Sequence, residues 1–130
     1  MLGRKKQPPI RSLIGEGTVI QGELRFDAGL RIDGEVQGDV LASGGRTLLV
    51  ISQGARVAGR VEAGHVILCG AIHGPIVCDE LLEVQPGARI VGDVRYALLE
   101  LHPGAVVEGE LRPLKAEEKP ALKLAASNTA

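Results

Sequence analysis

The sequence predicts an all-β fold, a single-stranded parallel β-helix, because one short pattern occurs six times along the chain. The pattern is Gly, two residues, a β-branched apolar residue, one residue, Gly, one residue and an aliphatic residue. Its copies start at residues 17, 29, 54, 69, 87 and 104, with Cys69 replacing the first Gly of the fourth. The starts lie 12, 25, 15, 18 and 17 residues apart. We call one full turn of the solenoid a coil. A coil of about 17 residues gives three strands of about five residues and a triangular cross-section.

The pattern also predicts which side each residue faces. Side chains alternate along a strand, so the β-branched residue and the aliphatic residue four positions later point the same way. We expect them to form columns inside the six coils. The inward pairs are Ile20/Leu24, Ile32/Val36, Val57/Val61, Ile72/Ile76, Ile90/Val94 and Val107/Leu111. The residues expected on the solvent side after the second Gly are Glu23, Glu35, Arg60, Pro75, Asp93 and Glu110.

Composition agrees with this fold. The chain has 130 residues, enough for one domain, and its only aromatic residues are Phe26 and Tyr96. A globular core of this size normally buries several aromatic side chains, whereas the narrow interior of a β-helix needs columns of aliphatic ones. Eighteen glycines fit a chain that turns at every corner.

Three segments follow from composition and charge. Residues 1–13 are predicted to be a flexible basic tail, residues 14–111 the β-helix, and residues 112–130 a disordered tail. The long step between the second and third copies contains Ser43–Arg46, which we expect to be an extruded loop. The tails carry +4 and +2, which leaves 7 basic against 14 acidic residues, or −7, on the body. An acidic rod of this kind is a poor binder of nucleic acid.

The residues that resemble ligands or catalytic groups are better explained by the repeat. Gly15-Glu16-Gly17 has no following Gly-Lys-Ser/Thr, so no nucleotide site is predicted. His65, Cys69, His73 and Cys78 match no common zinc spacing, and the pattern assigns them to different sides. We expect Cys78 to pack inside and His73 to face solvent. No metal, no cofactor and no enzymatic activity are predicted.

The repeat array resembles the bactofilin family. Residues 14–36 (IGEGTVIQGELRFDAGLRIDGEV) are similar to the opening of the bactofilin domain, and residues 99–111 (LELHPGAVVEGEL) to its end. The resemblance implies a right-handed triangular β-helix that polymerises end to end, without nucleotide, into filaments lacking polarity. It also implies a bacterial cytoskeletal scaffold, often at the inner membrane, that localises cell-wall enzymes or chromosome-segregation proteins. Family members often carry an aromatic residue at a polymer contact in the last coil, where this chain has Val106-Val107.

Polymerisation is also expected from the pattern itself. Both ends of a solenoid expose unpaired backbone groups over an apolar core, and neither tail has the composition of a polar cap. The predicted interface residues are Ile14, Ile20 and Leu24 in the first coil and Val106, Val107 and Leu111 in the last. The alternative left open is an adaptor that does not polymerise, because its tails plug its ends.

The N-terminal tail is predicted to bind an anionic membrane surface. Met1 and Leu2 are apolar, and Arg4, Lys5 and Lys6 are basic. No secretion signal and no apolar run of about 20 residues is present, so we expect a cytoplasmic protein at the inner membrane. Each basic residue contributes only about 1 kcal/mol, so firm attachment needs the many copies of a filament.

The main alternative in another class is a trimeric left-handed β-helix acyltransferase with hexapeptide repeats. Ile14, Ile20, Phe26 and Ile32 are spaced by six residues, as such repeats are, and His102 would be its catalytic base. The six-residue spacing ends after the second copy, and no His lies on a long loop. The pattern alone does not determine handedness.

Overall fold

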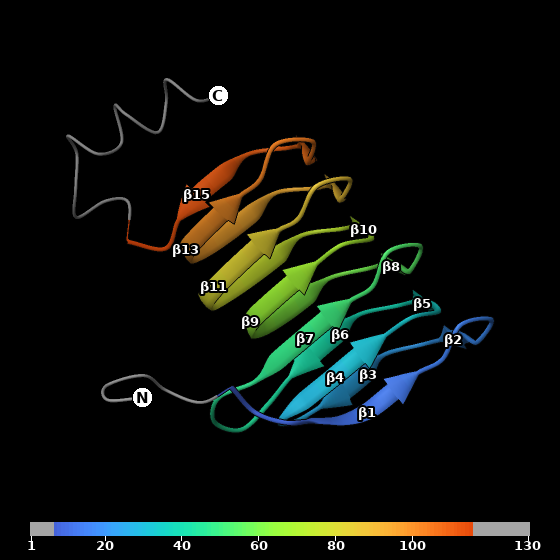
Figure 1. Cartoon of the computed structure of the whole chain (residues 1–130). Helices are drawn as coiled ribbons and strands as arrows, with labels where there is room; N and C mark the ends of the chain where they lie inside the picture. The colour runs from blue at the N-terminus through green and yellow to red at the C-terminus, as the bar shows by residue number, and fades with distance from the viewer. Residues whose placement is uncertain (1–6, 116–130) are drawn as a thin grey trace.

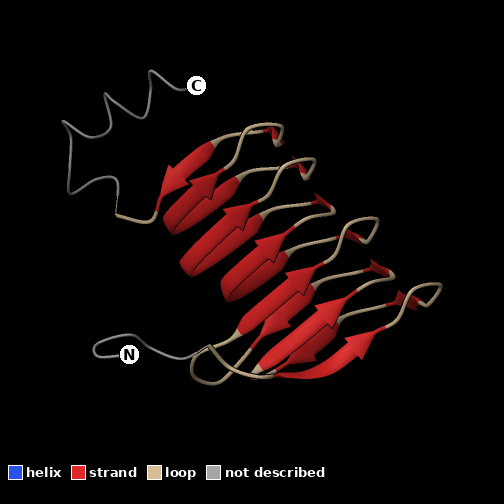
Figure 2. Ribbon diagram, in the orientation of Figure 1, coloured by secondary structure: helices blue, strands red, loops and turns tan. Residues whose placement is uncertain are grey.

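The computed structural model of the protein describes residues 7–115, which form a three-sided stack of parallel strands six coils tall (Figure 1). Every described element is a strand joined by turns and loops (Figure 2). Side 1 is a separate six-stranded sheet of β2 (Val19–Gln21), β5 (Glu35–Gln37), β8 (Arg56–Ala58), β10 (Ala71–His73), β12 (Arg89–Val91) and β14 (Val106–Glu108). The predicted β-helix is therefore confirmed.

The other two sides belong to one continuous sheet, because three long strands bend from one side onto the next. These are β9 (Val61–Leu68), β11 (Ile76–Val84) and β13 (Val94–Leu101). Side 2 is completed by β3 (Leu24–Phe26), β6 (Val40–Ala42) and β15 (Leu111–Pro113). Side 3 is completed by β1 (Ile10–Ile14), β4 (Gly29–Ile32) and β7 (Leu48–Ile51).

Each side contributes a column of aliphatic side chains to the interior. On side 1 the paired residues are Ile20, Val36, Val57, Ile72, Ile90 and Val107. On side 2 they are Leu24, Val40, Val61, Ile76, Val94 and Leu111. On side 3 they are Ile14, Ile32, Ile51, Leu68, Val84 and Leu101. The members from the four inner coils are all 0% exposed, so the columns form the centre of the core, and further inward residues such as Leu49, Val66 and Leu82 complete it on side 3.

The predicted position of the second copy is wrong by four residues. Ile32 pairs with Ile14 and Ile51 on side 3, whereas Val36 pairs with Ile20 and Val57 on side 1. The second copy therefore starts at residue 33, and its two neighbouring steps are 16 and 21 residues. The pattern matched at residue 29 because aliphatic residues recur every four positions from residue 32 to residue 40, and Asp33 replaces the expected Gly.

This shift changes the residue that follows the second glycine. It is Asp39 and not Glu35, and its Oδ1 accepts a hydrogen bond from the backbone N–H of Arg60 at 2.9 Å. Asp93, at the same position three coils later, accepts from the N–H of Glu110 at 3.1 Å. An aspartate at this corner therefore holds the next coil as well as facing solvent.

The β-helix extends beyond both predicted boundaries. Strand β1 begins at Ile10, inside the predicted tail, and pairs with β4 through Ile10, Ser12, Leu13 and Ile14. Strand β15 ends at Pro113. The glycine pattern marks sides 1 and 2 only, so it gave no indication of this strand on side 3. Ser43–Arg46 is a loop between β6 and β7, as expected. The predicted disorder of residues 1–6 and 116–130 lies outside the described residues.

The glycine after each side 1 strand lets neighbouring coils approach closely. Gly74 has φ +154°, and a Cβ built on it would lie 2.1 Å from the backbone oxygen of Gly59 in the coil before. The equivalent glycines at 38, 92 and 109 show the same contact at 2.1–2.3 Å. No side chain fits at this corner without separating two coils.

Gly74→Ala should therefore destabilise the protein strongly. The clash is with a fixed backbone oxygen, so we expect a loss of about 2 kcal/mol or more and a fall in Tm of roughly 8 °C. Gly45→Ala is the matched control, because a Cβ there meets no atom within 4 Å. Thermal unfolding followed by circular dichroism distinguishes the two variants, and equal Tm values would contradict this account of the corner.

Candidate polymer interface

Both ends of the rod expose apolar side chains that the inner coils bury. At the first coil Ile14, Ile20 and Leu24 pack against the core but remain half-buried. At the last coil Val107 and Leu111 are also half-buried, although their column partners Ile90 and Val94 are 0% exposed. The cause is the absence of a further coil, since the side chains occupy the same inward positions throughout.

The exposed large apolar side chains of residues 7–115 are confined to these two coils. They are Ile10, Leu13 and Val19 in the first coil and Leu98, Leu101 and Val106 in the last. None lies on the four coils between. Leu101, 48% exposed, belongs to an inward column and was missed by the sequence analysis because side 3 carries no repeated glycine pattern.

Val106, predicted as an interface residue, does not point into the core. It alternates with Val107 along β14, so its side chain lies on the outer side of the rod, where it is 43% exposed. It is still part of the apolar rim of the last coil.

The ends also carry open strand edges. Strands β2 and β3 each pair with one neighbour, in the second coil, and β14 and β15 each pair with one neighbour, in the fifth coil. An exposed parallel edge over an apolar core is a template for pairing with another chain. Within residues 7–115 no element covers these edges.

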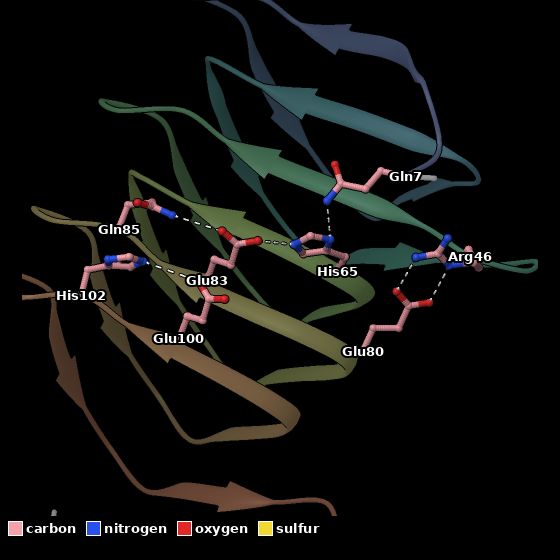
Figure 3. A network of polar contacts seen from close by, with 8 residues as sticks. All are labelled: Gln7, Arg46, His65, Glu80, Glu83, Gln85, Glu100 and His102. Atoms are coloured by element: carbon pink, nitrogen blue, oxygen red, sulfur yellow. Dashed lines mark hydrogen bonds and ion pairs between the residues drawn. The ribbon is translucent and has the colours of Figure 1, made fainter. Parts of the chain in front are cut away.

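The chain that precedes β1 is attached to the flank of the rod (Figure 3). The Nε2 of Gln7 lies 2.9 Å from Nδ1 of His65, a residue that is 6% exposed on the outer side of β9. The other ring nitrogen of His65 lies 2.6 Å from Oε2 of Glu83 on β11. The predicted membrane-binding residues Met1, Leu2, Arg4, Lys5 and Lys6 lie outside the described residues. Residues 7–115 contain no helix that could cross a membrane.

The histidines and cysteines do not form a common site. Cys78 is 0% exposed inside side 2, as predicted, and burial followed by the charge of Asp79 raises the pKa of its thiol to about 12. Cys69 is half-buried at a corner, whereas His65 lies on the outer flank. His102 lies on the last coil, with its Nε2 3.7 Å from Oε1 of Glu100. Within residues 7–115 no group of three metal-ligating side chains converges.

A small cavity of about 160 Å³ lies beneath the extruded loop. Its lining includes Ser43, Gly44, Thr47 and Asp79. The side chain of Thr47 is used by the fold, because its Oγ1 accepts a hydrogen bond from the backbone N–H of Gly64 at 2.9 Å.

Comparison with known proteins agrees with this geometry. A family model described as "Bactofilin: Polymer-forming cytoskeletal" matches residues 12–112. Bactofilin BacO of Myxococcus xanthus is 32% identical over 84 residues, which is 65% of this chain and 64% of BacO. Bactofilin BacP of the same organism is 33% identical over 84 residues, 34% of its own length. The chain therefore spans less than two thirds of either relative.

A solved structure is also similar. The cryo-electron microscopy reconstruction of Thermus thermophilus bactofilin double helical filaments matches with a TM-score of 0.68 and 30% identity. The match covers 78% of this chain and 99% of that one.

The two cysteines should differ in reactivity. In the folded protein at about pH 8, an alkylating reagent should modify Cys69 and leave Cys78, because reaction needs an accessible thiolate. Mass spectrometry of the alkylated peptides measures this directly, and the unfolded protein in denaturant, where both should react, is the control. Equal labelling rates in the folded protein would contradict the inward position of Cys78.

Proposed function

We propose, since the chain belongs to the bactofilin family of polymer-forming cytoskeletal proteins, that it is a bacterial scaffold that assembles end to end into filaments without nucleotide. One observation carries this proposal. The apolar side chains exposed on residues 7–115 are gathered on the first and last coils, beside the open strand edges. Joining two ends continues both the core and the hydrogen-bonded ladders.

The gain from such a junction is substantial. Full burial of a Val, Leu or Ile side chain contributes about 1.5–3 kcal/mol, and a half-buried one retains roughly half of that. Val107, Leu111 and Leu101 at one end, with a similar set at the end that meets them, therefore supply several kcal/mol. Each new backbone hydrogen bond adds about 1 kcal/mol. No nucleotide is needed, since the energy comes from burial and pairing.

The alternative of a plugged adaptor receives less support. The described part of the N-terminal segment runs along the flank to His65 and does not cross the open face of the first coil. The acyltransferase alternative is disfavoured by the match of a cytoskeletal family model to residues 12–112. The six-residue spacing from Ile14 to Ile32 describes the passage through the first coil only.

Attachment to a membrane is the second part of the proposal. Met1 and Leu2 with Arg4, Lys5 and Lys6 would bind an anionic bilayer at the cytoplasmic face of the inner membrane. Gln7, the first described residue, lies on the flank beside β9 and away from both ends of the rod, so attachment through the tail would be compatible with stacking. A filament lacking polarity, held in this way, would localise cell-wall enzymes or chromosome-segregation proteins.

The end contacts are tested by electron microscopy of the purified protein without nucleotide. The wild type should form filaments, and the double variant Leu101→Arg with Val107→Arg should not, because two guanidinium groups would enter the apolar junction. Ala58→Arg, on the outer side of the third coil, is the matched control and should assemble. Filaments of the double variant, or none from the folded wild type, would refute end-to-end assembly.

The tail is tested by co-sedimentation with anionic liposomes. Replacing Arg4, Lys5 and Lys6 with Glu should release filaments from the liposomes, since attraction becomes repulsion. Neutral liposomes provide the control for charge. If the triple variant sediments with anionic liposomes as the wild type does, the tail is not the attachment site.

A further inference from the structure

The outer surface of side 3 carries a column that is covered at one end and open at the other. We call it the flank column, and its paired residues are Gly29, Leu48, His65, Leu81 and Leu98. Their strand neighbours, such as Leu49 and Val66, are 0% exposed in the core, so the column faces outward. Contiguous apolar side chains on an outer strand surface point to a contact site.

The cover of the first three residues is the segment Gln7-Pro8-Pro9. Gln7 contacts His65, and the backbone oxygen of Pro9 lies 2.3 Å from where a Cβ on Gly29 would be. Leu48 lies between these two contacts and is only 5% exposed. Proline fixes an extended backbone and donates no hydrogen bond, so this segment lies on the flank as a strap and does not pair as a strand.

The rest of the column is open. Leu81 is half-buried and Leu98 is 65% exposed, the largest value among the exposed large apolar residues of the described chain. Followed from Ile10 back to Gln7, the strap runs from the first coil toward the fourth, in the direction of Leu81 and Leu98. These two residues lie one and two coils beyond His65, about 5 and 10 Å away.

Residues 1–6 are long enough to reach the open part of the flank column. From Gln7 back to Leu2 is five residues, which span up to about 17 Å when extended. Beside the open part of the column lie the carboxylates of Glu83 and Glu100, which are ladder partners, and the side chain of Glu100 is 55% exposed. The apolar pair Met1-Leu2 fits the exposed leucines, and the three basic residues that follow fit the two carboxylates.

We propose that residues 1–6 of this chain dock on their own flank, with Met1 and Leu2 on Leu81 and Leu98 and the basic side chains beside Glu83 and Glu100. The protein then has a closed form, in which its apolar terminus is sheltered, and an open form, in which the terminus is free for a membrane. This regulation rests on the proposed membrane attachment, but the docking itself does not.

Docking is tested with Leu2→Trp, because the chain has no tryptophan of its own. In the unassembled fraction from size-exclusion chromatography, the introduced tryptophan should emit at shorter wavelength than in a peptide of residues 1–9 with the same substitution. Adding Leu98→Ser should move the emission toward that of the peptide. Leu41→Ser, on the outer side of β6, is the matched control and should leave it unchanged. Circular dichroism melts confirm that each variant is folded.

The same flank variants measure the effect on membrane binding. In dilute protein with Leu2 intact, Leu98→Ser should bind anionic liposomes about three- to tenfold more tightly, because the fraction with a free tail rises. His65→Ala, which removes the contact with Gln7 and leaves Leu98 in place, should also tighten binding to anionic liposomes. Docking would be overturned if Leu2→Trp alone emitted at the wavelength of the peptide. It would also be overturned if adding Leu98→Ser left the emission wavelength of Leu2→Trp unchanged. Emission that shifts while no form binds liposomes would retain docking and refute the proposed attachment.

Discussion

The structure depends on the close approach of backbones at the glycine corners. Gly38, Gly59, Gly74, Gly92 and Gly109 stack so that each lies against the carbonyl oxygen of the glycine one coil before. This contact keeps successive coils in register, and the parallel ladders and the three aliphatic columns depend on that register. The interior is narrow, with one or two inward side chains from each side of a coil, such as Leu49 and Ile51 on side 3. This explains why Val, Ile and Leu fill it and why aromatic residues are scarce.

The same geometry leaves open strand edges and half-buried apolar side chains at the two ends of the rod, whereas the strands of the inner coils are paired on both sides. Every inner coil satisfies its strand edges and its inward apolar columns through two neighbours, so it has no open edge for a third. The first and last coils have one neighbour each and retain half-buried residues such as Ile20 and Val107. The proposed end-to-end assembly would therefore complete an interaction that already occurs between each pair of adjacent coils inside the molecule.

Much of this was predictable from residue spacing, and the failures have physical causes. The columns through Ile72 and Ile76 follow from the glycine pattern, and so does the burial of Cys78. The second copy was misplaced because Asp33 replaces its first glycine. Ile32 also matches the β-branched position of the pattern, although it lies on side 3 and not on side 1. Strand β1 and Leu101 lie on side 3, which precedes the first glycine of the pattern and therefore has no inward position in it. The contact between Gln7 and His65 joins residues 58 positions apart by side-chain chemistry alone, and no periodicity indicates it.

The central claim, that subunits continue one another's β-helix, is tested most directly by cryo-electron microscopy of filaments formed without nucleotide. Six coils at about 4.8 Å predict a rise of roughly 29 Å per subunit, with a repeat of about 4.8 Å that runs unbroken through the junctions. If opposite ends alternate, the full repeat doubles to about 58 Å. A subunit spacing set by the width of the rod, with strands lying along the filament axis, would contradict the account.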